Sequence, residues 1–186
     1  YALNQYGDVV RTGVATAGND HRLGAQEAPP AIISLYTGVG AEAKIDAIIG
    51  GAPLEGYGDG DRTIDAGASS VGPITTREED RNRTAPFPFC GNRFEFRASG
   101  SSQNIAFPLA MVNTAMAAGC KVLVEKINGG KSVRDAVAEL FAENRRVVFN
   151  GDGYSDAWPV EAESRGLLNL KTTPDAIATF ADEKNK

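Results

Sequence analysis

Residues 92–97 read NRFEFR, a stretch in which charged and aromatic side chains alternate. Successive side chains of a β-strand point to opposite faces, so a period of two sends the aromatic residues into a core and the charged residues onto the other face. The aromatic positions are Phe94 and Phe96, and the charged positions are Arg93, Glu95 and Arg97. The pattern therefore predicts a strand with a charged surface on one side.

The charged side of this strand has a definite chemistry. A carboxylate such as Glu95, held between two guanidinium groups, stays ionised and can ligate a hard cation. The arginines can bind phosphate or carboxylate through paired N–H groups. The face can thus form the floor of a nucleotide and metal site. The same six residues also fit an exposed strand with cross-strand ion pairs, and on their own they favour this second interpretation.

Two longer segments add to this pattern. Residues 18–31 read GNDHRLGAQEAPPA, and residues 84–102 read TAPFPFCGNRFEFRASGSS. In this order they resemble the second half of the catalytic domain of glutamine synthetase. The sequences HRLGAQEAPPAI (21–32) and NRTAPFPF (82–89) resemble the type III branch of that family. The resemblance extends from about Asp8 to the end of the chain and is weakest in the glycine-rich stretch 38–70.

Strands that carry chemistry, packed against helices that do not, indicate an α+β domain. The resemblance implies more: a curved antiparallel sheet backed by helices, forming part of an active site shared between adjacent subunits of a homo-oligomeric ring, expected to be a dodecamer. The chain would be one partial catalytic domain, 1–186. Its expected parts are an ammonium and glutamate lid loop at 18–30, a variable connector at 50–74, a phosphate and metal strand at 83–97 and a helical part at 104–186.

The resemblance implies an ATP-dependent ligation of ammonia to glutamate. ATP would phosphorylate the glutamate side chain, and ammonia would attack the γ-glutamyl phosphate to give glutamine. Phosphoryl transfer needs positive charge around the transferring oxygens and divalent metals that bridge them. The implied cofactors are ATP and Mg²⁺ or Mn²⁺, and the other substrates are glutamate and ammonium.

Site residues carry over by their place in the matching motifs. Arg97 would stabilise the transferring phosphoryl group and bind the substrate, and Arg93 would contact nucleotide phosphates. Glu95 would ligate the metal, and Arg83 would hold the γ-phosphate region. The common forms of the family have a further phosphate-binding arginine where this chain has Pro88, so another group must replace it.

In the lid loop, Arg22 would bind the substrate carboxylate. Glu27 would close the entrance and help to attract and deprotonate ammonium, and the closed lid would keep water from the acyl phosphate. The resemblance thus makes Glu27, Arg83 and Arg97 the catalytic residues. The neighbouring His21 has no assigned role, because a lone histidine in a loop is more often a structural group than a ligand.

One metal ligand does not make a site. Magnesium takes about six oxygen ligands, whereas Glu95 is the one convincing position in this chain. The family draws its other carboxylates and a metal-binding histidine from sequence that would precede Tyr1, and type III members continue past Lys186. We therefore expect an internal piece of a larger subunit, inactive on its own.

Composition bounds the remaining possibilities. With 186 residues, 42% of them hydrophobic and 23% charged, the chain has the make-up of one soluble globular domain. A formal net charge of −5 argues against nucleic-acid binding. No run approaches the roughly 20 apolar residues of a membrane span, and the first residues lack a secretory signal. These features predict neither a nucleic-acid nor a membrane partner. A cytoplasmic location fits, and an organelle would fit equally well.

Other motifs carry little chemistry. The segment 56–67, GYGDGDRTIDAG, contains neither a Walker lysine nor a Gly-x-Gly-x-x-Gly pattern, and a calcium loop opening at Asp59 would need glutamate where Ser70 stands. It is interpreted as a solvated connector. Cys90 and Cys120 lack CxxC spacing and are expected to be reduced structural thiols.

Periodicity and capping residues predict the other elements. Valines and threonines in 8–17 predict a strand, and Pro30 predicts the start of a helix that runs to residue 38. Further helices are expected at 42–49 and 105–127, after Ser132, at 156–165 and from Thr173. Residues 144–146 are expected to be a solvated helix end, and Met111, Met116 and Trp158 to be packing residues.

Two alternatives to an active synthetase remain. A related ligase or kinase of the same superfamily, acting on another amine or acid, would be expected to alter Glu27, which is present. A non-catalytic descendant with a structural role should have lost at least one of Arg93, Glu95 and Arg97, and all three are present.

Overall fold

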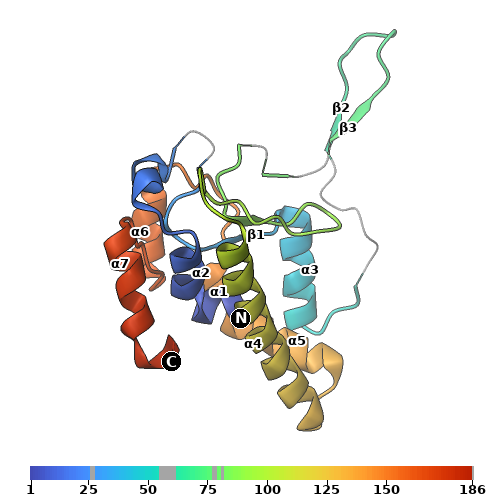
Figure 1. The fold of residues 1–186 in the computed structure, drawn as a ribbon. Coiled ribbons are helices and arrows are strands. Elements are labelled where there is room, and N and C mark those ends of the chain that lie inside the picture. Colours follow the sequence, from blue (N-terminus) through green and yellow to red (C-terminus); the bar gives the residue numbers. More distant parts are fainter. Residues whose placement is uncertain (26–27, 55–61, 77–78, 81, 186) are drawn as a thin grey trace.

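The structure is a computed structural model that describes residues 1–25, 28–54, 62–76, 79–80 and 82–185. It mixes helices with short strands, as expected for an α+β domain (Figure 1). The α-helices are α1 (Ala2–Gln5), α2 (Gly7–Gly13), α3 (Val39–Ile49), α4 (Ala106–Asn128), α5 (Val133–Glu143), α6 (Ala157–Ser164) and α7 (Thr173–Ala178). The 3₁₀ turns are η1 (Ala17–Arg22), η2 (Arg145–Val147), η3 (Thr179–Ala181) and η4 (Glu183–Asn185). The strands are β1 (Leu35–Tyr36), β2 (Arg62–Ile64), β3 (Ile74–Thr76) and β4 (Phe87–Pro88).

A narrow strip of extended backbone runs through the middle of the body. β1 pairs in parallel with β4, so that Leu35 lies opposite Phe87. Leu35 also bridges Val148 in parallel, and Phe89 bridges Phe94 in antiparallel orientation. The strip is thus formed by 148–149, β1, 86–90 and 93–97. Among the described residues the regular sheets have two strands each, so the expected curved antiparallel sheet remains a prediction.

Two apolar clusters hold the strip against the helices. The larger one joins α1, α2 and α4 to the strip, and the smaller one places α6 against residues 32 and 149. Their buried members are Ala2, Val10, Ile33, Phe87 and Ala115 in the first, and Ile32, Trp158 and Ala162 in the second. Trp158 stacks on Phe149 with ring centroids 3.7 Å apart. The expectation that this tryptophan is a packing residue is confirmed.

The predicted strand at 8–17 is wrong, because this segment contains helix α2. Val10 is fully buried in the larger cluster. The hydroxyl of Thr12 lies 2.8 Å from the carbonyl oxygen of Asp8, one turn earlier, and 2.7 Å from that of Ala176 in α7. Packing against other helices and these bonds override the weak preference of valine and threonine for strands.

The predicted helix from Pro30 to residue 38 is also wrong. Residues 31–34 are buried and irregular, and they lead into β1. A short apolar run buried on all sides does not reveal by periodicity whether it is strand or helix. Here parallel pairing with β4 decides for the strand.

Most of the predicted helices are confirmed. α3 and α4 match the expected segments, and α3 ends at Gly50. The Ser132 side chain accepts a hydrogen bond from the Asp135 amide at 3.1 Å, which is the predicted cap of α5. α6 begins one residue later than expected, with Asp156 rather than Ser155 at its N-cap, and Thr172 caps α7.

Helix α4 differs from the expected core helix. It packs against α1, α2 and α5, but Met116 is 52% exposed, so the interpretation of Met116 as core is wrong. Within the described part of the chain, α4 is the one helix long and apolar enough to cross a membrane, with a mean hydropathy of 1.5 in its most apolar window. The expectation that no run reaches this length is therefore corrected. One such helix is weak support for a membrane span, since core helices of soluble proteins share these properties.

The connector contains a feature that the sequence did not indicate. β2 and β3 pair in antiparallel fashion, with Ile64 opposite Ile74, and project away from the body (Figure 1). Ile64 and Ile74 are exposed, which agrees with a solvated connector. Asp59 and the first half of the 56–67 segment lie outside the described residues.

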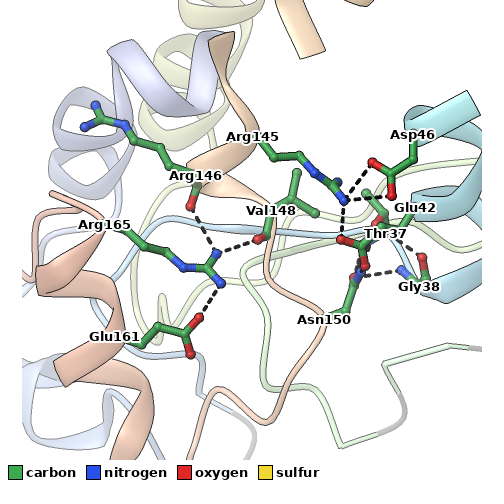
Figure 2. A network of polar contacts seen from close by, with 10 residues as sticks. All are labelled: Thr37, Gly38, Glu42, Asp46, Arg145, Arg146, Val148, Asn150, Glu161 and Arg165. Atoms are coloured by element: carbon green, nitrogen blue, oxygen red, sulfur yellow. Dashed lines mark hydrogen bonds and ion pairs between the residues drawn. The ribbon is translucent and has the colours of Figure 1, made fainter. Parts of the chain in front are cut away.

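Residues 144–146 follow the end of α5, and Arg146 is exposed as predicted, but the other two residues are not simply solvated. Asn144 is buried, and Arg145 forms ion pairs with Glu42 and, at 3.1 Å, with Asp46 of α3 (Figure 2). The network continues through Asn150, whose side-chain oxygen accepts from the amides of Thr37 and Gly38 at 2.8 and 2.9 Å. Arg165 donates to the carbonyl oxygen of Val148 at 2.7 Å. The network fixes the strip between α3 and α6.

Candidate functional site

The charged stretch folds back onto the segment that precedes it. The amide of Cys90 donates to the carbonyl of Arg93 at 2.8 Å, that of Glu95 to Pro88 at 3.0 Å, and that of Arg97 to Pro86 at 2.8 Å. Gly91, with a φ of 77°, provides the left-handed backbone of the turn. Residues 93–97 are therefore extended and paired, as predicted, although the pairing is too short for a regular strand.

The predicted alternation of faces is confirmed for the charged residues and for one of the two aromatics. Phe96 stacks on Phe87 with centroids 4.6 Å apart and packs against the larger apolar cluster. Phe94 contacts Phe89 but is 57% exposed, so its predicted burial is wrong. Phe94 lies nearer the turn, where the cluster no longer reaches.

The three charged side chains form a continuous chain of ion pairs. Arg93 Nη2 lies 3.2 Å from Glu95 Oε1, and Arg97 Nε lies 3.1 Å from Glu95 Oε2. Each carboxylate oxygen thus accepts from a different guanidinium. The hydrogen bond from Arg97 is the main cause that lowers the pKa of Glu95 below its ordinary value of 4.5. Glu95 is therefore ionised at neutral pH, as the sequence predicted.

Asp80 is a site residue that the sequence reasoning missed. Its side chain is 6% exposed, and its Oδ2 lies 3.0 Å from Arg97 Nη1. The same oxygen accepts from the Ala85 amide at 2.8 Å. Arg97 also donates to the Asp80 carbonyl oxygen at 3.0 Å. Asp80 fixes Arg97 from the side opposite Glu95. The charged run 80–83 was the available signal, but the sequence does not show which of its members is buried.

Arg83 lies three residues after Asp80 and next to a second missed residue. Its backbone has a φ of 57°, which is unusual for a residue other than glycine and is often found at functional sites. Its carbonyl oxygen accepts from the hydroxyl of Tyr154 at 2.7 Å. A Cβ atom on Gly153 would lie 2.6 Å from the carbonyl oxygen of Thr84, so the two backbones approach closely.

Position 88 provides no substitute for the arginine of the common forms. Pro88 is fully buried in β4. The side chain of Pro88 therefore has no surface that could contact a nucleotide.

The lid loop is only partly described. Arg22, at the end of η1, is exposed and donates to the Ser101 hydroxyl at 3.2 Å. This bond joins the loop to the segment that follows Arg97. Glu27 lies outside the described residues, so its predicted role stays a prediction. His21 is exposed.

Cys90 is unsuited to nucleophilic chemistry. Its thiol is buried, and burial together with the nearby Glu95 carboxylate raises its pKa. Cys90 and Cys120 are both free thiols. The burial of Cys90 agrees with the expected structural role, whereas Cys120 is exposed.

The described residues offer an incomplete metal site. Glu95 presents an ionised, partly exposed carboxylate, which suits a hard divalent cation. Among the described residues, however, no group of three or more histidine, cysteine, aspartate and glutamate side chains could hold a metal. Glu95 thus fits as one oxygen ligand of a site whose other ligands lie elsewhere.

The hydrogen bond from Arg97 to Glu95 predicts how the Glu95 carboxyl group titrates with pH. The pKa of Glu95 is lower in the folded protein than its ordinary value. The ion pairs therefore stabilise the fold above the ordinary pKa, and this stabilisation is lost as the pH falls through the pKa of Glu95 in the folded protein. We expect the Glu95 side-chain carboxyl signal, followed by ¹³C NMR, to titrate with a midpoint below 4.5. Arg97→Gln should move this midpoint upward. A midpoint that the substitution leaves unchanged would show that Arg97 does not set it.

Comparisons with known proteins agree on one family. The family model described as the glutamine synthetase C-terminal domain matches residues 132–186. A type-3 glutamine synthetase of Dictyostelium discoideum is 42% identical over 191 residues, covering 99% of this chain and 26% of that relative. Glutamine synthetases of Bacteroides fragilis and Butyrivibrio fibrisolvens are 38% and 35% identical, covering 96% and 99% of this chain.

The matched region includes both motifs, since it takes in nearly the whole chain. The chain spans about a quarter of the length of these curated relatives. The chain is therefore similar to glutamine synthetases over nearly its whole length, and to the C-terminal domain of that family over residues 132–186.

Proposed function

We propose that this chain supplies the phosphate- and metal-facing part of an active site that ligates ammonia to glutamate with ATP. The observation that carries the proposal is the segment 93–97 of the strip, where two guanidiniums and one carboxylate lie on one face and Asp80 fixes Arg97. The printed names of the relatives support the same reaction.

Each of the three arginines would contact a different part of the phosphates. Arg97 is the most strongly fixed, with bonds to Glu95 and Asp80, so it can hold a transferring phosphoryl oxygen without reorganising. Arg93 is more exposed and would reach nucleotide phosphates. Arg83, held by its backbone to Tyr154, would contact the γ-phosphate region.

Glu95 would hold one divalent cation, Mg²⁺ or Mn²⁺. Such a cation neutralises the charge on the phosphate oxygens that it bridges. On binding, the carboxylate would exchange part of its contact with Arg93 for the cation. Arg93, the more exposed of the two arginine partners, would then be free to turn toward phosphate.

The lid would complete the site. Arg22 would bind the glutamate carboxylate, and Glu27 would receive the proton that ammonium loses. The bond from Arg22 to Ser101, a residue that follows the strip, supports a lid that would close near the strip. A homo-oligomeric ring with a shared site, a curved antiparallel sheet and a cytoplasmic location belong to the same proposal.

The test is a glutamine assay on the native polypeptide isolated from its source. We expect glutamine to form only when ATP, ammonium, glutamate and Mg²⁺ or Mn²⁺ are all present, with release of ADP and phosphate. Omitting ammonium should stop glutamine formation, which separates this reaction from ligation of another amine. Native protein that forms no glutamine with either metal would refute the proposal.

A further inference from the structure

A second site is indicated by a cavity of about 240 Å³ that none of the charged residues of the strip lines. It lies among α1, α2, residues 31–33, residues 166–170 and η4. Liquid water occupies about 30 Å³ per molecule, so the cavity has room for a small organic molecule. Nothing in the proposed synthetase reaction uses it.

The charges that line this cavity do not balance. Lys184 pairs with Asp8 at 2.8 Å, and Arg11 pairs with Asp20 at 3.3 Å. Arg146 donates to two neutral oxygens, those of Asn4 and Gly166. Figure 2 shows its side chain extending away from the network of Arg145 and Arg165. Among the described residues Arg146 thus has no carboxylate partner, and the cavity keeps one positive charge.

Arg11 adds a buried donor to the same cavity. Its side chain is 3% exposed. Nε donates to the carbonyl oxygen of Leu170 at 2.9 Å, and Nη2 donates to Asp20. Nη1 takes part in none of the hydrogen bonds between described residues. Burial lowers the pKa of Arg11, which reflects the cost of desolvating its charge. A bound anion would offset that cost.

Beside the charged residues and the polar Asn4 and Gln5, the lining contains several aliphatic side chains. Leu3, Ile33, Leu168 and Leu170 contribute to the walls. An inorganic anion would leave these walls without contacts, whereas a short aliphatic chain would be desolvated by them. Both carboxylate oxygens of Asp8 already accept hydrogen bonds, so the lining does not offer a place for an ammonium group.

From this combination we propose that the cavity is a binding site for a small organic acid, with its carboxylate on Arg11 and Arg146 and its short aliphatic chain against the leucines. This site is separate from the proposed synthetase site. Its failure would leave the proposed function untouched.

The test is a titration of the protein with 4-methylpentanoate, followed by isothermal calorimetry and by the amide NMR signals of Leu168 and Leu170. We expect saturable binding that shifts both signals. Charge-assisted hydrogen bonds contribute about 1.5–3 kcal/mol, so Arg146→Gln should weaken binding about tenfold or more. Arg134→Gln is the matched control, because Arg134 is exposed on α5 and does not line the cavity.

Two further ligands distinguish the source of affinity. The neutral 4-methylpentanamide keeps the aliphatic chain but lacks the negative charge, and inorganic phosphate keeps a negative charge but lacks the aliphatic chain. Both ligands should bind much more weakly than the acid. Phosphate that binds as tightly as the acid would overturn the organic-acid assignment. Binding that Arg146→Gln and Arg134→Gln weaken equally, or that leaves the Leu168 and Leu170 signals unmoved, would overturn the site itself.

Discussion

Glu95→Gln is expected to lower the rate of glutamine formation about a thousandfold or more. The substitution keeps the size of the side chain but removes its charge, so the proposed metal loses an anionic ligand. A bridging metal contributes several kcal/mol to stabilising the transition state, and each 1.36 kcal/mol corresponds to a factor of ten in rate. The measurement is kcat of the native polypeptide at saturating ATP, glutamate and ammonium, over a range of metal concentrations.

Loss of the ion pairs is a second consequence of this substitution. Glutamine would still accept a hydrogen bond from Arg97 but would no longer neutralise the two guanidiniums. The pairs are partly exposed, so we expect a small change in stability beside a large change in rate. Glu125→Gln is the control, since Glu125 lies on α4 and forms an exposed pair with Lys121. An enzyme that keeps more than a tenth of its activity after Glu95→Gln would rule out the metal role.

The strip could be predicted from the sequence because its pattern is local. The period of two over 92–97 requires no distant partner, and the turn at Gly91 brings the paired segment from the immediately preceding residues. Helices with clear caps, such as α5 after Ser132, were predictable for the same reason. The family resemblance then supplied roles for the charged side chains, which no pattern alone could give.

The errors in secondary structure concern segments whose structure depends on distant residues. α2 contains valines and threonine that favour a strand, but Arg11 bonds to Leu170 and Thr12 lies against Ala176, more than 150 residues away. β1 is a strand because it lies between β4 and Val148. Residues 144–146 bond to α1 and α3, so a charged sequence that resembles a solvated end is fixed against two helices, with Asn144 buried.

The candidate site was incomplete for the same reason. Arg93, Glu95 and Arg97 could be identified because they share one face of one segment. Asp80 and Tyr154 act on the site through bonds that span 17 and 71 residues. The charged run 80–83 points to the region of Asp80, but no sequence pattern shows that Asp80 is the buried member or that Tyr154 lies beside Arg83. Both hold arginines in place, and such supporting residues become visible only when the arginines have been located.

Asp80→Asn tests the most important of these supporting bonds. We expect it to lower the free energy of unfolding by about 3 kcal/mol, because removing one partner of a buried ion pair leaves a charge without compensation. The value is at the lower end for such pairs, since Arg97 keeps its bond to Glu95. Unfolding by urea, followed by tryptophan fluorescence, would measure this difference.

The same substitution should also affect catalysis in folded protein. Without Asp80, the Nη1 of Arg97 loses its anionic anchor and the guanidinium can turn about its bond to Glu95. Misplacement of a positioning group by about 1 Å can cost up to a hundredfold in rate. We expect kcat to fall at least tenfold while the KM for ATP changes less, measured well below the unfolding temperature. Asp156→Asn is the control, because Asp156 is exposed and its side chain does not cap α6. If Asp80→Asn lowers stability but leaves kcat unchanged, Asp80 supports the fold without positioning Arg97 for chemistry.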